Sequence, residues 1–463
     1  MTIAPRATVT VVGGGLAGSE AAWALAERGF QVTLYEMRPG TRTAAHQTDR
    51  LAEIVCSNSF KSVDLTNAHG LLKAELRALG SVLLPVADDV RVPGGTALVV
   101  DRQRFSEEVH RRLTAHPNIS LVRRETTELP SPAVIATGPL TSERLSQAIG
   151  NRLGAAALSF YDAIAPIVSG DSLEHGRLYP LSRYGKGQGD DYLNAPLDAE
   201  SYQRFIDALL EGDQFAGHDF DQVPYFEGCL PVEEMARRGR ETLRFGPMKP
   251  VGLPDPRTGR DPHAVVQLRR EDAAGQMWNL VGFQTRLRIP EQQRVFRTIP
   301  GLESAEFLRY GSIHRNSYVN SPAALGVGLT ARDDELLFFA GQITGVEGYT
   351  ESLGTGLLAG INLARRLSGE PIAVPPATTM LGGLYRYLVE ADPEHFQPMN
   401  ANFGLLDPLP GKLKKDRKKE LLVERAQVDF EAWLVRCGIS TSDKAPPEVH
   451  HKGTKDTEGS LTY

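Results

Sequence analysis

The chain has 463 residues, enough for about two or three domains with sizeable cores. It carries 51 Lys and Arg against 57 Asp and Glu, and this net charge of −6 restricts any nucleic-acid contact to local basic patches. Three dispersed cysteines exclude a disulfide framework and a CxxC metal site, and no apolar run reaches the roughly 18 residues of a membrane helix. We therefore expect a cytoplasmic protein with no metal and no membrane association.

The first predicted elements are a strand at residues 8–12, a glycine turn and a helix. Gly13 would form the tight turn, Gly15 would let the backbone approach a pyrophosphate, and Gly18 would let the helix pack closely on the sheet. The second predicted strand, at 31–35, ends at Glu36, a candidate acceptor for a ribose 2′-hydroxyl. This pattern favours FAD or NAD over NADP, with cofactor-binding positions at Gly13, Gly14, Gly15, Leu16, Ala17, Gly18 and Glu36.

The next predicted elements continue a doubly wound α/β sheet. They are helices at 71–79 and 104–115 and strands at 119–122 and 133–136. From about residue 160 to 310 the pattern changes to short apolar runs separated by Gly, Pro and charged clusters. We interpret that stretch as a mixed α+β domain inserted into a Rossmann-like FAD-binding domain of the glutathione-reductase type.

The first domain is predicted to resume near the carboxyl end. A strand at 335–340 runs into Gly341 and Gln342, and after further glycines a helix is predicted at 357–367 with its amino terminus toward an anion or a flavin ring. Gly341 and Gln342 are therefore candidate cofactor-binding residues. The expected domain limits are 1–160 and 316–437 for the two parts of the FAD-binding domain, 161–315 for the inserted domain, and 438–463 for a disordered tail.

The densest cluster of cations lies between Lys412 and Arg425, and it includes Lys414 and Lys415. A basic helix of this kind can contact RNA phosphates, or it can simply be a solvated helix face. On the first interpretation Lys412, Lys414 and Lys415 are candidate substrate-binding residues.

Across nearly all of residues 8 to 436 the sequence resembles the TrmFO family of folate- and FAD-dependent tRNA uracil-5-methyltransferases. The motifs that carry the resemblance are GGGLAGSEAA at 13–22, EIVCSNSFKS at 53–62, VPGGTALVVDRQRFS at 92–106 and FEGCLPVEEMARRG at 226–239. The resemblance implies methylation of uridine 54 in the tRNA T-loop. It implies 5,10-methylenetetrahydrofolate as carbon donor, FAD as carrier and reductant, NAD(P)H as hydride source, and no obligate protein partner.

The chemistry implied by the resemblance requires a reactive thiol, because carbon 5 of uracil becomes nucleophilic only after a thiolate adds at carbon 6. Cys229 is the candidate nucleophile, and Cys56 is a second candidate catalytic thiol. Glu347 and Tyr349 are candidates for flavin and folate contacts. Arg183 and Lys186 are candidates for folate or RNA binding.

Three other functions remain open from the sequence. One is the larger tRNA flavoenzyme that modifies wobble uridines, which shares the FAD-binding domain but needs an additional carboxyl-terminal helical domain. Another is a flavin oxidoreductase that uses NAD(P)H on a small molecule, and the third is a noncatalytic FAD-bound protein that binds RNA or acts as a sensor. Turnover that depends on tRNA and methylenetetrahydrofolate separates the expected function from all three.

Overall fold

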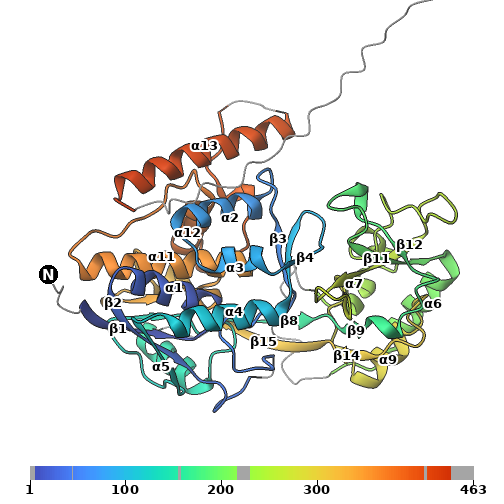
Figure 1. Ribbon diagram of the computed structural model, residues 1–463, viewed down its shortest axis with the longest axis horizontal. Coiled ribbons are helices and arrows are strands. Elements are labelled where there is room, and N and C mark those ends of the chain that lie inside the picture. Colours follow the sequence, from blue (N-terminus) through green and yellow to red (C-terminus); the bar gives the residue numbers. More distant parts are fainter. Residues whose placement is uncertain (1–5, 44, 155–157, 216–229, 411–413, 440–463) are drawn as a thin grey trace, which may run out of the picture.

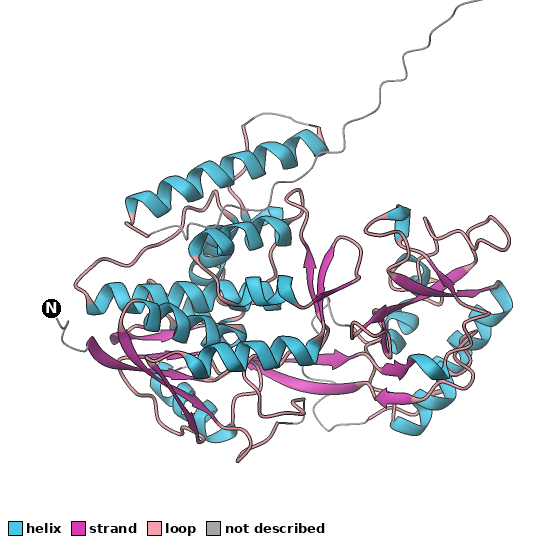
Figure 2. Cartoon of the chain, in the orientation of Figure 1, coloured by secondary structure: helices cyan, strands magenta, loops and turns pink. Residues whose placement is uncertain are grey.

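The computed structural model describes residues 6–43, 45–154, 158–215, 230–410 and 414–439 (Figures 1 and 2). Its first layer is a six-stranded sheet in the order β16-β17-β7-β1-β2-β6, parallel except for β16. The strands come from both ends of the chain, and the predicted α/β fold class is confirmed. Their bounds are β1 Arg6–Val12, β2 Phe30–Glu36, β6 Ile119–Arg123, β7 Ala133–Ile135, β16 Thr330–Ala331 and β17 Asp334–Phe339.

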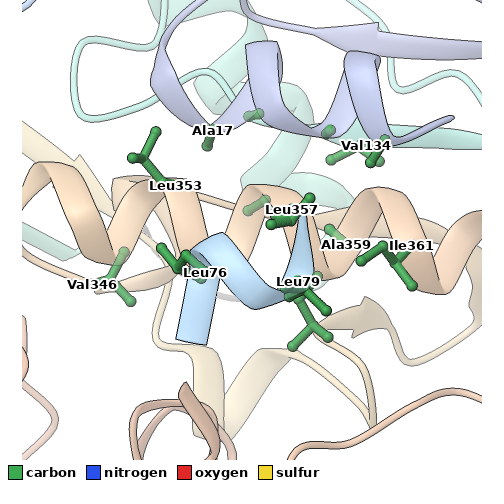
Figure 3. Packing of buried hydrophobic residues seen from close by; sticks show 14 of the residues in the cluster. Ala17, Leu76, Leu79, Val134, Val346, Leu353, Leu357, Ala359 and Ile361 are labelled. Carbon is green, nitrogen blue, oxygen red and sulfur yellow. The ribbon is translucent and has the colours of Figure 1, made fainter. Parts of the chain in front are cut away.

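Two helices beside this sheet pack unusually closely against each other. They are α1 (Leu16–Glu27) and α11 (Tyr349–Leu367). A Cβ at Gly356 would lie 2.2 Å from the carbonyl oxygen of Ala17, so the two backbones are in contact. Figure 3 shows Ala17 of α1 facing Leu353 and Leu357 of α11. The prediction that α11 begins at Leu357 is wrong, because glycines that weaken an isolated helix are tolerated where they allow this close packing.

Further helices cover the sheet and each other. Glu75 of α2 joins two of them, since its carboxylate accepts the N–H groups of Met380 and Leu381 at the start of α12 at 2.8 and 2.7 Å. These backbone groups have no partner within their own helix. The helices are α2 Ala68–Leu79, α3 Leu83–Asp89, α4 Arg102–Ala115, α5 Glu143–Leu153, α10 Ser321–Ala324, α12 Met380–Glu390 and α13 Lys415–Arg436.

A small antiparallel sheet and a pair of long strands connect this layer to the rest of the molecule (Figure 1). The small sheet contains β3 (Ser59–Ser62), β4 (Arg91–Val92) and β5 (Ala97–Val100). The long strands β8 (Leu158–Ile164) and β15 (Ser312–Tyr318) pair antiparallel with one another. Because they lead into and out of the inserted domain, we propose its limits at residues 161 and 315.

The inserted domain is a six-stranded sheet in the order β10-β11-β12-β13-β9-β14. One face is apolar and packs on helices, with Ala195, Val266, Leu268 and Leu280 in its core. Because side chains alternate along a strand, the opposite face carries Asn194, Gln267, Arg269 and Asn279. The elements are β9 Ile167–Ser169, β10 Tyr179–Pro180, β11 Tyr192–Leu197, β12 Ala264–Arg270, β13 Met277–Leu280, β14 Phe307–Arg309, α6 Ala199–Glu211, α7 Val232–Arg238, α8 Thr242–Phe245 and α9 Ile289–Phe296.

Two classes of feature are absent from the described part of the chain. None of its helices is long and apolar enough to cross a membrane. Among the same residues, no group of three or more His, Cys, Asp or Glu side chains is placed to hold a metal ion.

We expect Gly356→Val to lower the free energy of unfolding by about 1–3 kcal/mol, because the new side chain would overlap the backbone of Ala17. Urea denaturation measures the change. Gly176→Ala is the control, since a Cβ there meets no atom within 4 Å, and it should change stability by less than about 0.5 kcal/mol. Equal stability of the two variants would contradict the close approach of α1 and α11.

Candidate functional site

The glycine turn between β1 and α1 forms one wall of an elongated cavity. Gly13 has a φ of +103°, and a Cβ at Gly18 would lie 1.8 Å from the carbonyl oxygen of Gly13, so both positions require glycine for backbone reasons. Gly15 differs from them, because a Cβ there would meet no protein atom within 4 Å. Its small size is therefore not needed for packing within the protein and leaves room at the amino terminus of α1.

The composition of the cavity wall fits a dinucleotide. The N–H groups at the first turn of α1 and the positive end of its dipole favour a phosphate. The buried hydroxyl oxygens of Thr126 and Ser142 have no hydrogen-bond partner among the described residues, so they are available to a ligand. The wall also includes Gly13, Gly14, Leu16, Ala17, Glu36, Arg38, His46, Val55, Arg124, Gly341, Gln342, Tyr349 and Ser352.

Glu36 lies at the end of β2 against the glycine turn, where the sequence places it. Its carboxylate accepts the backbone N–H groups of Gly14 at 3.1 Å and Arg38 at 3.0 Å, and it forms an ion pair with the Arg38 guanidinium at 2.9 Å. Burial raises the pKa of Glu36, but these bonds outweigh burial and hold it below the usual value. The residue is therefore a fixed anion in the cavity wall. Its contact with a ribose remains a proposal.

Arg38 was not predicted from the sequence, yet it organises this end of the cavity. Besides Glu36, its guanidinium binds the Glu53 carboxylate at 3.0 Å and the carbonyl oxygen of Thr48 at 3.1 Å. His46 lies nearby, and burial together with the positive charge of Arg38 lowers its pKa to about 4. The imidazole is consequently neutral at pH 7.

The resumed part of the first domain also lines the cavity. Gly341, with a φ of +77°, and Gln342 follow β17 after Ala340 and belong to the wall. The Gln342 amide donates to the Glu347 carboxylate at 2.5 Å. Glu347 thus lies behind Gln342 and does not itself line this cavity in the described structure.

Tyr349, the first residue of α11, connects the cavity to Cys56. Its hydroxyl oxygen accepts the backbone N–H groups of Cys56 and Ser57, each at 3.0 Å. Burial raises the pKa of Tyr349, so the hydroxyl stays protonated. The structure therefore brings together two predicted site residues that are 293 positions apart in the sequence.

The inserted domain holds the other side of residues 54–58, which we call the Cys56 loop. Arg269 donates to Asn58 Oδ1 at 3.1 Å and to Ser57 Oγ at 3.0 Å, and the Asn58 amide donates to the carbonyl oxygen of Arg270 at 2.9 Å. We call these three hydrogen bonds the interdomain clamp. No sequence motif indicated it, because the partners are about 210 residues apart.

An ion pair crosses the same boundary. Arg102 of α4 binds Glu271 at 2.9 Å and the carbonyl oxygen of Ile54 at 2.7 Å. Arg309 lies close by, and burial and the charge of Arg102 lower its pKa. The Arg309 guanidinium donates a long hydrogen bond, 3.4 Å, to the carbonyl oxygen of Ala45. Arg102 and Arg309 therefore lie near the Cys56 loop, in addition to Arg269 of the interdomain clamp.

The remaining predicted residues are not gathered at this site. Cys229 and Lys412 lie outside the described residues, and Lys415 is described only as the first residue of α13. Lys414 is exposed just before that helix. Arg183 and Lys186 lie on a surface turn of the inserted domain, where the Arg183 guanidinium donates to the carbonyl oxygen of Lys249 at 2.8 Å.

Comparison with known proteins identifies close relatives. Residues 8–371 match the family described as glucose inhibited division protein A. The chain is 57% identical over 428 residues to the methylenetetrahydrofolate–tRNA-(uracil-5-)-methyltransferase TrmFO of Geobacter sulfurreducens, covering 92% of this chain and 98% of the relative. It is 54% identical over 427 residues to the protein of the same name from Thermus thermophilus, covering 92% and 96%.

Among solved structures, the fold resembles that of GidA from Aquifex aeolicus. The TM-score is 0.65 with 16% sequence identity, and the match covers 92% of this chain and 74% of that one. At this identity the likeness shows a shared fold.

Tyr349→Phe should speed hydrogen exchange of the Cys56 and Ser57 amides about tenfold, because it removes their shared acceptor. Exchange measured by mass spectrometry on peptides spanning 54–60 tests this. Tyr385→Phe is the matched control, since the Tyr385 hydroxyl accepts the N–H of Gly328 at 2.7 Å, away from that loop. Unchanged exchange in Tyr349→Phe would mean that the hydroxyl does not hold the loop.

Proposed function

The chain belongs to the TrmFO family, and we propose that it methylates carbon 5 of uridine 54 in the tRNA T-loop with 5,10-methylenetetrahydrofolate as carbon donor. The observation that carries the proposal is the identity of 57% over 98% of a curated methyltransferase. A cavity suited to a dinucleotide, ending at Tyr349 beside Cys56, supports it.

FAD is the proposed cofactor, and when bound it supplies the carrier and reductant chemistry of the reaction. The first turn of α1 would hold its pyrophosphate, with Gly15 leaving space for it. Glu36 would take the ribose hydroxyls, and Thr126 and Ser142 would satisfy further polar groups. Gly341 and Gln342 would lie at the flavin end, where Tyr349 fixes the neighbouring Cys56 loop.

Two cysteines have roles in the proposed chemistry, and Cys229 is the one that bonds to uracil. The thiolate of Cys229 adds to carbon 6 of uracil, which places the electron pair on the carbon 5 side and makes that carbon nucleophilic toward the methylene carbon. Loss of the carbon 5 proton and cleavage of the carbon–sulfur bond return the thiolate. The bond from the methylene carbon to its donor nitrogen breaks as well, and a hydride, which reduced FAD would supply, completes the methyl group. Cys56, held by Tyr349, takes part in removing that proton or in protecting the flavin site.

The remaining parts of the proposal are the RNA-binding lysines, the hydride source and the cellular compartment. Lys412, Lys414 and Lys415, before and at the first residue of α13, contact RNA phosphates, since a protein of net charge −6 binds a polyanion through clustered cations. NAD(P)H is the external hydride source, and the enzyme works in the cytoplasm without an obligate protein partner.

Gly15→Val should abolish flavin retention and leave the fold of the ligand-free protein intact. The residue has φ −77° and ψ −166°, which valine readily adopts, and its Cβ would enter the cavity without touching protein. Absorbance at flavin wavelengths and thermal unfolding of the stripped proteins measure the two effects. A yellow Gly15→Val protein would contradict the proposed pyrophosphate position.

Cys229→Ala should lose covalent attachment to a tRNA that contains 5-fluorouridine, because fluorine cannot leave carbon 5 as a proton does and the wild-type adduct persists. Denaturing electrophoresis of labelled RNA detects the complex. Cys437→Ala is the control, since Cys437 caps the end of α13, where its carbonyl oxygen binds Arg365. A persistent adduct in Cys229→Ala that disappears in Cys56→Ala would assign the nucleophile to Cys56.

A further inference from the structure

The inserted domain carries exposed aromatic rings that the proposed chemistry does not use. Tyr184 lies in the short helix η2 (Arg183–Gly185) and is 62% exposed, and Phe245 at the end of α8 is 82% exposed. Arg183 ties the two loops together, because its guanidinium donates to the carbonyl oxygens of Lys249 and Val251. We call the surface formed by Tyr184, Lys186, Phe245, Lys249 and Val251 the aromatic patch.

The backbone keeps Tyr184 turned outward. Its φ of 58° is in the left-handed region, which is uncommon for an aromatic residue. The N–H of Tyr184 donates to the carbonyl oxygen of Gly252 at 3.2 Å. The ring rests on Gly252, where a Cβ would lie 2.4 Å from a ring carbon. Glycine at 252 thus lets the ring pack against the backbone while most of the residue stays in solvent.

The charges around the rings favour an anionic partner. Lys186 and Lys249 are both exposed within the patch, and Asp190 is the exposed acid of the same turn. Exposed rings next to cations are the combination with which proteins bind unpaired nucleotides, since the rings stack on bases while the cations meet phosphates. A paired duplex offers no free base faces to such rings.

The patch has a fixed position relative to the first domain. Asp191, at the base of the turn, accepts the N–H of Gly95 at 3.1 Å, and the hydroxyl of Tyr192 donates to the carbonyl oxygen of Gly94 at 3.1 Å. Gly94 and Gly95 lie between β4 and β5, which Figure 1 shows next to β11. The turn therefore bridges the two domains.

A series of hydrogen-bonded residues connects the patch to the Cys56 loop. Arg183 donates to Gln267 Oε1 at 3.3 Å, and Gln267 stands two residues before Arg269 on the same face of β12. Arg269 in turn holds Ser57 and Asn58 through the interdomain clamp. The aromatic patch is therefore linked to the Cys56 loop through hydrogen-bonded residues of β12.

We propose that Tyr184 and Phe245 stack on unpaired bases of the RNA substrate, next to the nucleotide that is modified, while Lys186 and Lys249 contact its phosphates. The inference rests on the proposed function, because it takes RNA as the substrate. It adds a binding surface outside the cavity and the thiols.

The test compares affinities for an unmodified tRNA transcript over a range of salt concentrations, using the flavin-loaded protein. The double variant Tyr184→Ala/Phe245→Ala should bind about 10- to 100-fold more weakly with an unchanged salt slope, because stacking releases no counterions. Lys186→Ala/Lys249→Ala should instead reduce the salt slope by about two. Tyr184→Phe, which retains the ring, should bind like the wild type.

Val327→Ala serves as the matched control, since Val327 is 67% exposed on the first domain near β16, and this variant should bind normally. Wild-type affinity in the double alanine variant would overturn the stacking role while leaving the proposed function intact. Loss of self-association on sedimentation, with RNA affinity retained, would reassign the patch to a second copy of the chain. A wild-type protein that neither binds nor methylates tRNA would contradict the proposed function itself.

Discussion

The backbone contact between α1 and α11 determines where the two ends of the site lie. Gly356 and Gly360 let α11 approach Ala17 and Ala21 so closely that a Cβ at either glycine would lie within 3 Å of the α1 backbone. Gly15 at the start of α1 and Tyr349 at the start of α11 therefore open onto one cavity. A dinucleotide spanning that cavity from Glu36 would end beside the Cys56 loop, although these elements come from opposite ends of the chain.

The Cys56 loop is held by hydrogen bonds from both domains. Tyr349 fixes its two backbone N–H groups from the cavity, and Arg269 fixes Ser57 and Asn58 from the inserted sheet. Hydrogen bonds involving a charged group are stronger than neutral ones, so the guanidinium is the firmer of the two supports. The amphipathic inserted sheet suits this role, because its apolar face builds a core while its polar face meets the first domain.

The parts of this arrangement that depend on local sequence were predictable. Gly13, Gly18 and the strand ending at Glu36 follow from spacing alone, because turn and helix packing are local. The start of α11 was misplaced, since Gly354 and Gly356 weaken an isolated helix and only tertiary packing shows why they are there. The interdomain clamp and the Arg102–Glu271 pair join residues far apart in sequence, and no periodicity encodes such contacts.

The central claim is that the cavity and the Cys56 loop together serve folate-dependent methylation of a uridine in tRNA. The most direct measurement incubates the purified flavin-loaded protein with an unmodified tRNA transcript, 5,10-methylenetetrahydrofolate and NADPH, and maps 5-methyluridine by mass spectrometry. One 5-methyluridine is expected, at position 54, and its formation should require both the folate and the reduced nicotinamide. Oxidation of NADPH that proceeds equally without tRNA, with no methylated uridine formed, would contradict the central claim.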